Sequence, residues 1–304
     1  MYYPSGYYRK KALAALKGHW QTALLVALVV NLPTMLMQAI SAFTGNDPMT
    51  RLEAYIVTSS RDGVMSREAL IGEINAILSS TSFWVIRGLD VVALVITPCL
   101  SLGMYKWLMD LLHGQEQPVN SVLSRMKYFF KALGLQLQVI LRVLLWMLPG
   151  IIAAGFLVYP VLRAGNAQAQ LAALQRSQGL SFPVLLLMAV PGAVAALRYA
   201  LADYIMAENP ENKILFCVRR SRELMRDRKK DLFFLMVSFL LWYLLELLIA
   251  SMLSGVLSLV FQMLAGLALT VYLSCSVCAF YQRLTEAEAK HESPDAEPAA
   301  EELN

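Results

Sequence analysis

The sequence predicts an all-α membrane protein, a polytopic bundle of six transmembrane helices with short amphipathic helices at the membrane interface. Of its 304 residues, 58% are hydrophobic and only 16% are charged, whereas soluble domains carry about 25% charged residues. The mean hydropathy is +0.53. The apolar residues form continuous runs and do not alternate with polar ones, which favours helices over the strands of a membrane barrel.

Six apolar runs are long enough to cross a bilayer as helices, because about 20 residues suffice. They lie near residues 22–43, 84–105, 132–158, 182–206, 232–253 and 256–281. The first run is longer than the core of a typical signal peptide, so we expect it to remain as a span. Residues 1–21 then form a cytoplasmic segment, residues 22–284 the membrane domain, and the acidic residues 285–304 a disordered cytoplasmic tail.

The distribution of lysine and arginine predicts the orientation. If the N-terminus is cytoplasmic, the cytoplasmic segments contain 18 of these residues and the outside loops contain 5. Cytoplasmic loops carry an excess of lysine and arginine. We therefore expect both termini to be cytoplasmic.

A basic block precedes the fifth run, and it has two interpretations. It includes Arg219, Arg220, Arg222, Arg226, Arg228, Lys229 and Lys230. The simpler interpretation is a cytoplasmic anchor that fixes the fifth span. In the other, Ile214, Val218, Ser221 and Met225 form one face of an amphipathic helix, and the bases bind anionic lipid or a partner. Residues 66–78 and 121–133 also have amphipathic spacing.

Four stretches together resemble a known family. They are ALAALKGHW (12–20), VPGAVAALRYALADYIMAENPE (190–211), SRELMRDRKKDLFFLMVSFLLW (221–242) and AFYQRL (279–284). The chain resembles the bacterial integral membrane proteins called domain of unknown function 975. The resemblance implies a bacterial membrane protein with several spans, and we expect it in the plasma membrane. It implies no particular activity.

Signatures of enzymes are absent from the sequence. It contains neither the HExxH arrangement of zinc peptidases nor the glycine-rich loop that binds nucleotide phosphates. Cys275 and Cys278 form a CxxC pair inside an apolar run, where small packing residues are the simpler interpretation than a redox or metal site. We expect no catalytic residues, no metal and no cofactor.

Ionisable residues inside the predicted spans are costly unless they are paired. Their depths predict an outer cluster of Arg87, Asp90 and Glu246 and an inner cluster of Arg142, Arg198 and Asp203. Such charges can hold helices together, or they can line a path for a substrate or proton. Glu246 is farthest from either interface, so it is the first candidate for a functional charge.

Small residues recur every four positions in two spans and predict helix–helix contact faces. They are Gly192, Ala196 and Ala200 in the fourth span and Gly266, Thr270, Ser274 and Cys278 in the sixth. The sequence as a whole favours a non-enzymatic scaffold, sensor or accessory subunit, with a small-solute or lipid transporter as the alternative. Its expected partners are the bilayer, anionic lipids and a membrane protein, and not nucleic acid.

Overall fold

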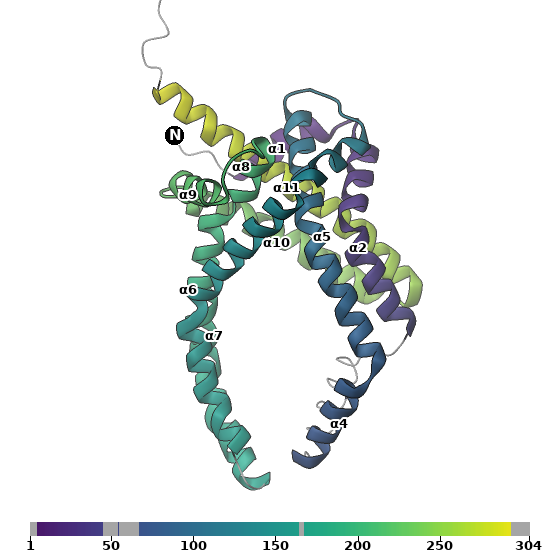
Figure 1. Ribbon diagram of the computed structural model, residues 1–304, viewed down its shortest axis with the longest axis vertical. Helices are drawn as coiled ribbons and strands as arrows, with labels where there is room; N and C mark the ends of the chain where they lie inside the picture. The colour runs from purple at the N-terminus through teal and green to yellow at the C-terminus, as the bar shows by residue number, and fades with distance from the viewer. Residues whose placement is uncertain (1–4, 45–53, 55–66, 164–166, 293–304) are drawn as a thin grey trace, which may run out of the picture. The chain divides into compact units, whose positions relative to one another are not determined.

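The computed structural model describes residues 5–44, 54, 67–163 and 167–292, and the regular structure in these ranges is helical. The elements in order are α1 (Ser5–Leu16), α2 (Trp20–Thr44), α4 (Arg67–Ser79), α5 (Thr81–Leu112), the 3-10 helix η1 (Val119–Tyr128), α6 (Phe129–Arg163), α7 (Ala167–Tyr199), α8 (Ala202–Glu208), α9 (Ile214–Leu224), α10 (Lys229–Met252) and α11 (Gly255–Glu292) (Figure 1).

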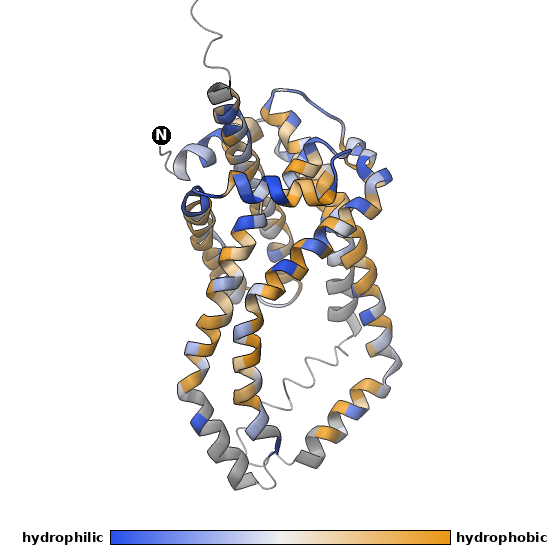
Figure 2. Cartoon of the chain, turned by 60° about the vertical axis from the view of Figure 1, so that its left-hand side comes forward, coloured by the Kyte–Doolittle hydropathy of each residue, from blue (hydrophilic) through white to orange (hydrophobic). Residues whose placement is uncertain are grey.

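Five stretches of the described chain are helical, long and apolar enough to cross a membrane. They are Phe83–Leu112, Val119–Pro160, Gly179–Glu208, Lys229–Met252 and Gly255–Ala289. The pair Ser5–Leu16 and Trp20–Leu36, bent by 102°, raises the number to six if it counts as one broken span. Figure 2 shows that the long helices are predominantly hydrophobic along their shafts. The predicted all-α polytopic membrane fold is confirmed.

The chain divides into two compact units, and four of its long helices run from one into the other. Unit 1 contains residues 1–30, 98–135 and 197–304, and unit 2 contains residues 31–97 and 136–196. In unit 1, α1 packs against α11 and α10, which also pack against each other. The rings of Tyr8 and Phe280 meet edge to face at 5.3 Å, and those of Phe239 and Tyr272 at 4.8 Å. These aromatic pairs fill the core of unit 1.

In unit 2, α6 and α7 approach closely at glycines. A β-carbon built on Gly150 would lie 2.5 Å from the Cα of Met188, and one built on Gly192 would lie 2.9 Å from Cγ of Met147. Helices in lipid associate through such close backbone contact. Gly192, a predicted packing residue, therefore lies at this helix crossing.

The fourth predicted span is interrupted near its C-terminal end. Helix α7 ends at Tyr199 and α8 begins at Ala202. The hydroxyl of the fully buried Ser221, on α9, donates to the carbonyl of Arg198 at 3.1 Å and accepts from the backbone N–H of Leu201 at 3.2 Å. A break in a helix frees backbone groups that need partners, and this serine supplies them from a distant part of the chain.

One further boundary differs from that predicted. Helix α11 continues to Glu292, so residues 285–292 are helical and do not belong to a disordered tail. The hydroxyl of Thr285 donates to the carbonyl of Gln282 at 2.9 Å, and Glu288 forms an ion pair with Arg220. These contacts extend the helix beyond the apolar run. The remaining residues of the predicted tail, 293–304, lie outside the described residues.

The predicted amphipathic segments are helical where the structure describes them. Residues 67–79 form α4, and residues 119–128 form η1, which leads directly into α6. Residue 66 lies outside the described part. Helices α10 and α11 are joined by a turn in which Gly255 has a φ of 61°, a conformation that favours glycine.

Candidate functional site

The C-terminal half of α11 is the centre of a set of polar contacts in unit 1, which we call the polar hub. Tyr281 on α11 donates a hydrogen bond to the carboxylate of Glu208 at the end of α8. The ring of Tyr204 stacks on that of Tyr105 at 4.4 Å and lies 6.4 Å from that of Tyr281. The hub thus joins α5, α8 and α11 through aromatic and polar contacts.

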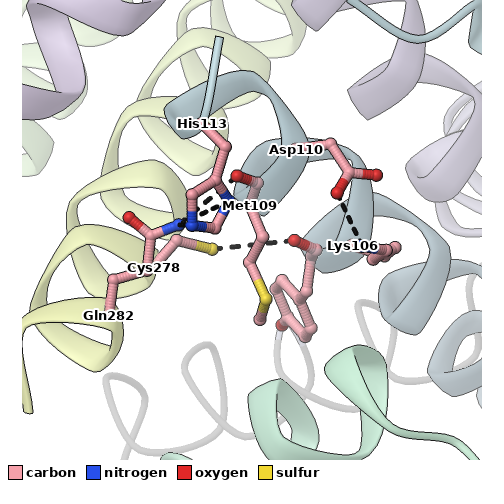
Figure 3. Close-up of polar contacts among 7 residues, drawn as sticks. Lys106, Met109, Asp110, His113, Cys278 and Gln282 are labelled. Carbon is pink, nitrogen blue, oxygen red and sulfur yellow. Dashed lines mark hydrogen bonds and ion pairs between the residues drawn. The ribbon is translucent and has the colours of Figure 1, made fainter. Parts of the chain in front are cut away.

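Figure 3 shows the side of the polar hub where α11 meets the end of α5. The amide of Gln282, buried in this contact, donates to the carbonyl of Met109 at 3.3 Å and lies 3.3 Å from Nδ1 of His113. On α5 itself, Lys106 and Asp110 form an ion pair at 2.6 Å. A buried amide that lacked these partners would be costly, so these contacts fix the registry of α11 against α5.

The cysteines occupy packed positions. All four are free and buried. In the CxxC pair, Sγ of Cys275 lies 3.9 Å from the carbonyl oxygen of Ala12 on α1, and Sγ of Cys278 lies 3.8 Å from that of Tyr105 on α5. The two thiols therefore face different helices. Burial raises the pKa of Cys217, outside the spans, to about 11, which leaves its thiol unreactive at neutral pH.

The structure brings two of the three predicted outer charges together. Arg87 and Asp90, on α5 in unit 2, form an ion pair at 2.9 Å. The guanidinium carbon of Arg87 also lies 5.8 Å from the centre of the Phe83 ring. Glu246 belongs to unit 1, on α10. The pair on α5 is therefore local to one helix.

Glu246 lies half-buried against α11. A β-carbon built on Gly266 would lie 3.5 Å from its Oε1 atom. One turn earlier on α10, Tyr243 lies beside Thr270. Glu246 and Tyr243 thus contact the predicted packing residues Gly266 and Thr270, and together they form a polar patch in the α10–α11 pair. Ser274 and Cys278, farther along α11, are buried.

The predicted inner charges are divided between the units. Arg142, on α6, is in unit 2, and Arg198 and Asp203 are in unit 1. Asp203 lies in the first turn of α8, where the N-terminal end of a helix stabilises negative charge. In the same region Ala196 is exposed and Ala200 is half-buried, while Ala195 and Tyr199 are buried. The buried face of α7 there is thus displaced from the predicted stripe.

Helix α9 has the predicted amphipathic character. Val218, Ser221 and Met225 are buried and Ile214 is half-buried, whereas Arg219, Arg222 and Arg226 are exposed. The other bases of the block have local contacts. Arg220 forms an ion pair with Glu288, Arg228 pairs with Asp231 at 3.6 Å, and Lys229 donates to the carbonyl of Arg226 at 3.1 Å. Lys230 is exposed.

A polar contact that the sequence does not indicate closes the loop before α9. Lys131, on α6, donates to the carbonyl of Pro210 at 3.0 Å and lies 3.6 Å from the carboxylate of Glu211. The hydroxyl of Tyr128 donates to the same carboxylate. The hydrogen bond from Tyr128 lowers the pKa of Glu211 most, and the charge of Lys131 lowers it further. The start of α6 therefore fixes the position from which α9 begins.

One ion pair in unit 1 should depend on pH. Nε2 of His19, after α1, lies 2.7 Å from the carboxylate of Glu116, and this hydrogen bond raises the pKa of His19 above 6.5. A raised histidine pKa stabilises the fold fully below 6.5, and this contribution is lost as the pH rises through the raised value. We expect the melting temperature of the wild-type protein to exceed that of Glu116→Gln at pH 5.5. The difference should be small, because the pair is exposed. The margin should vanish by pH 9. A margin independent of pH would contradict the assignment.

The comparisons with known proteins identify a family. The model of the family described as protein of unknown function (DUF975) matches residues 1–288. The chain belongs to the DUF975 family. The resemblance seen in the sequence is therefore confirmed, and the match covers both units of this DUF975 protein. No curated protein and no solved structure matches the chain significantly.

Proposed function

We propose that this DUF975 protein is a non-enzymatic scaffold, sensor or accessory subunit of the bacterial plasma membrane. Both termini are cytoplasmic in this proposal, which the distribution of 18 cytoplasmic against 5 outside lysine and arginine residues supports. The exposed apolar faces of its long helices then contact lipid and a membrane protein partner. Leu241 and Leu247 on α10, 72% and 67% exposed, are examples of such positions.

The observation that carries the proposal is the placement of Glu246. Its carboxylate lies against Gly266, one turn from Tyr243, which lies beside Thr270. A polar side chain placed this way can hold two helices together within lipid. The residues of the polar hub likewise connect helices of unit 1 to one another. This use of polar residues supports a structural role for them over a substrate path.

Access of water to position 246 tests the proposal against the transporter alternative. Glu246→Cys would be made in a variant in which alanine replaces the four native cysteines, and intact cells would be exposed to a membrane-impermeant thiol reagent. We expect no labelling until the protein is denatured, because the side chain packs against α11. Arg176→Cys, at an exposed position, is the control for labelling from outside.

Rapid labelling of position 246 in folded protein would contradict the proposal. It would mean that water reaches the middle of the α10–α11 pair, as a transporter requires. The denatured sample shows that the thiol is present and reactive, so the absence of labelling in cells would mean that position 246 is protected in the folded protein.

A further inference from the structure

Helix α9 lies between two membrane helices and is held close to both. The preceding span ends at Glu208 and the following one begins at Lys229. Short connections on each side of α9 leave it little freedom to move away from the bilayer surface. Ser221 further fixes it to the break between α7 and α8, through its hydrogen bonds to the backbone of Arg198 and Leu201. Its outward face is therefore presented to the membrane interface.

The outward face of α9 combines apolar and basic side chains. One side of α9 is lined by four exposed residues at spacings of three or four: Leu215, Arg219, Arg222 and Arg226. The last of them, Arg226, lies in the turn just after the helix ends at Leu224. We call these four residues the basic strip. Leu215 is 60% exposed, and the adjacent Phe216 is 50% exposed. Arginines beside exposed Leu and Phe are typical of helices that lie in the headgroup region.

The contacts within unit 1 separate the strip from the other bases nearby. Arg220 is paired with Glu288 and Arg228 with Asp231. Among the described residues, no ion pair is found for Arg219, Arg222 or Arg226. Glu223 lies at the edge of the strip, four residues after Arg219 and three before Arg226, but the described residues contain no ion pair between it and either arginine. Asp227 lies farther round the helix. Three guanidinium groups on a fixed helix are thus available to an external anion.

We propose that the basic strip is a binding site for the phosphate-bearing headgroups of anionic phospholipids. Arginine matches phosphate because its planar group can donate two parallel hydrogen bonds. Leu215 and Phe216 would enter the boundary between headgroups and acyl chains, where their exposure is favourable. The inference rests on the orientation proposed above, since anionic lipids give the cytoplasmic leaflet its negative surface potential.

Lipid binding to the purified full-length chain tests this site. Phosphatidylglycerol and phosphatidylcholine would be titrated into detergent-solubilised protein, and the bound lipids counted by native mass spectrometry. Each arginine near an anionic surface contributes about fivefold in affinity. The triple variant Arg219→Gln, Arg222→Gln, Arg226→Gln should therefore bind phosphatidylglycerol about a hundredfold more weakly, with phosphatidylcholine binding unchanged.

A matched control removes three exposed lysines of unit 1 that lie outside the strip. They are Lys10, Lys17 and Lys127, each replaced by glutamine. This variant should keep the wild-type preference for phosphatidylglycerol. Inorganic phosphate at the same concentrations should not displace the lipid, which separates a headgroup site at a membrane from a site for a free anion. The measurement in detergent does not depend on orientation, so its failure is distinguishable from a failure of the proposed topology.

Three outcomes would overturn the inference. They are unchanged phosphatidylglycerol binding by the arginine variant, an equal loss in the lysine control, and displacement by inorganic phosphate. If the triple variant cannot be purified folded, the single variants decide, because each should lose about fivefold.

Discussion

Replacing Phe280 by alanine is expected to destabilise unit 1 by about 3–5 kcal/mol, the usual cost of truncating a buried phenylalanine. The side chain is 0% exposed on α11, and its ring meets that of Tyr8 on α1 at 5.3 Å. The substitution removes this aromatic contact and leaves a cavity between α1 and α11. It should therefore also loosen the N-terminal helix.

The buried cysteines provide the measurement. All four lie in unit 1, so a thiol-reactive fluorophore reports when this unit opens during heating. Leu264→Ala on the same helix is the control, because Leu264 is 59% exposed and its loss leaves no buried cavity. Phe280→Ala should melt far below wild type and below Leu264→Ala. Equal melting temperatures for the two variants would mean that α1 does not pack on α11 as described.

Replacing Gly103 by alanine should cost at least about 3 kcal/mol, the upper part of the range for overpacked cores. A β-carbon on Gly103, in α5, would lie 2.1 Å from the carbonyl oxygen of Val122 in η1. The clash is with backbone, so no change of side-chain rotamer relieves it. Helix α5 and η1 must separate to admit a single methyl group.

Gly88→Ala is the matched control for this substitution. Gly88 is on the same helix, and nothing lies within 4 Å of a β-carbon built there. Alanine is the better helix former by about 1 kcal/mol, so this variant should be neutral or slightly stabilised. In the same thiol assay, which reports unit 1, Gly103→Ala should lower the melting temperature, whereas Gly88→Ala, a substitution in unit 2, should leave it unchanged. A Gly103→Ala protein as stable as Gly88→Ala would contradict the contact between α5 and η1.

The long helices could be predicted from the sequence because continuous apolar runs have few other stable forms in a membrane. The interruption between Tyr199 and Ala202 could not. It depends on Ser221, a residue distant in sequence whose hydroxyl satisfies the backbone groups freed by the break. The extension of α11 to Glu292 likewise depends on the tertiary pairing of Glu288 with Arg220. Hydropathy alone contains neither signal.

The candidate site shows the same division between local and tertiary features. Arg87 and Asp90 are three residues apart on one helix, so their pairing follows from helical spacing. The faces of α9 also follow from spacing. In contrast, the contacts of Tyr281 with Glu208 and of Lys131 with Pro210 join distant segments. Depth in the bilayer gave no means of predicting which helices lie beside each other.

The proposed function and the lipid site both depend on the side of the membrane on which α9 lies, and this can be measured directly. Two single cysteines, Lys213→Cys and Arg176→Cys, would be introduced into the variant without native cysteines. Lys213 lies where α9 begins and Arg176 lies on α7, and both positions are exposed. In intact cells, an impermeant thiol reagent should label Arg176→Cys alone, and Lys213→Cys should be labelled only after the cells are opened. Labelling of Lys213→Cys in intact cells, with Arg176→Cys protected, would contradict the cytoplasmic placement of α9.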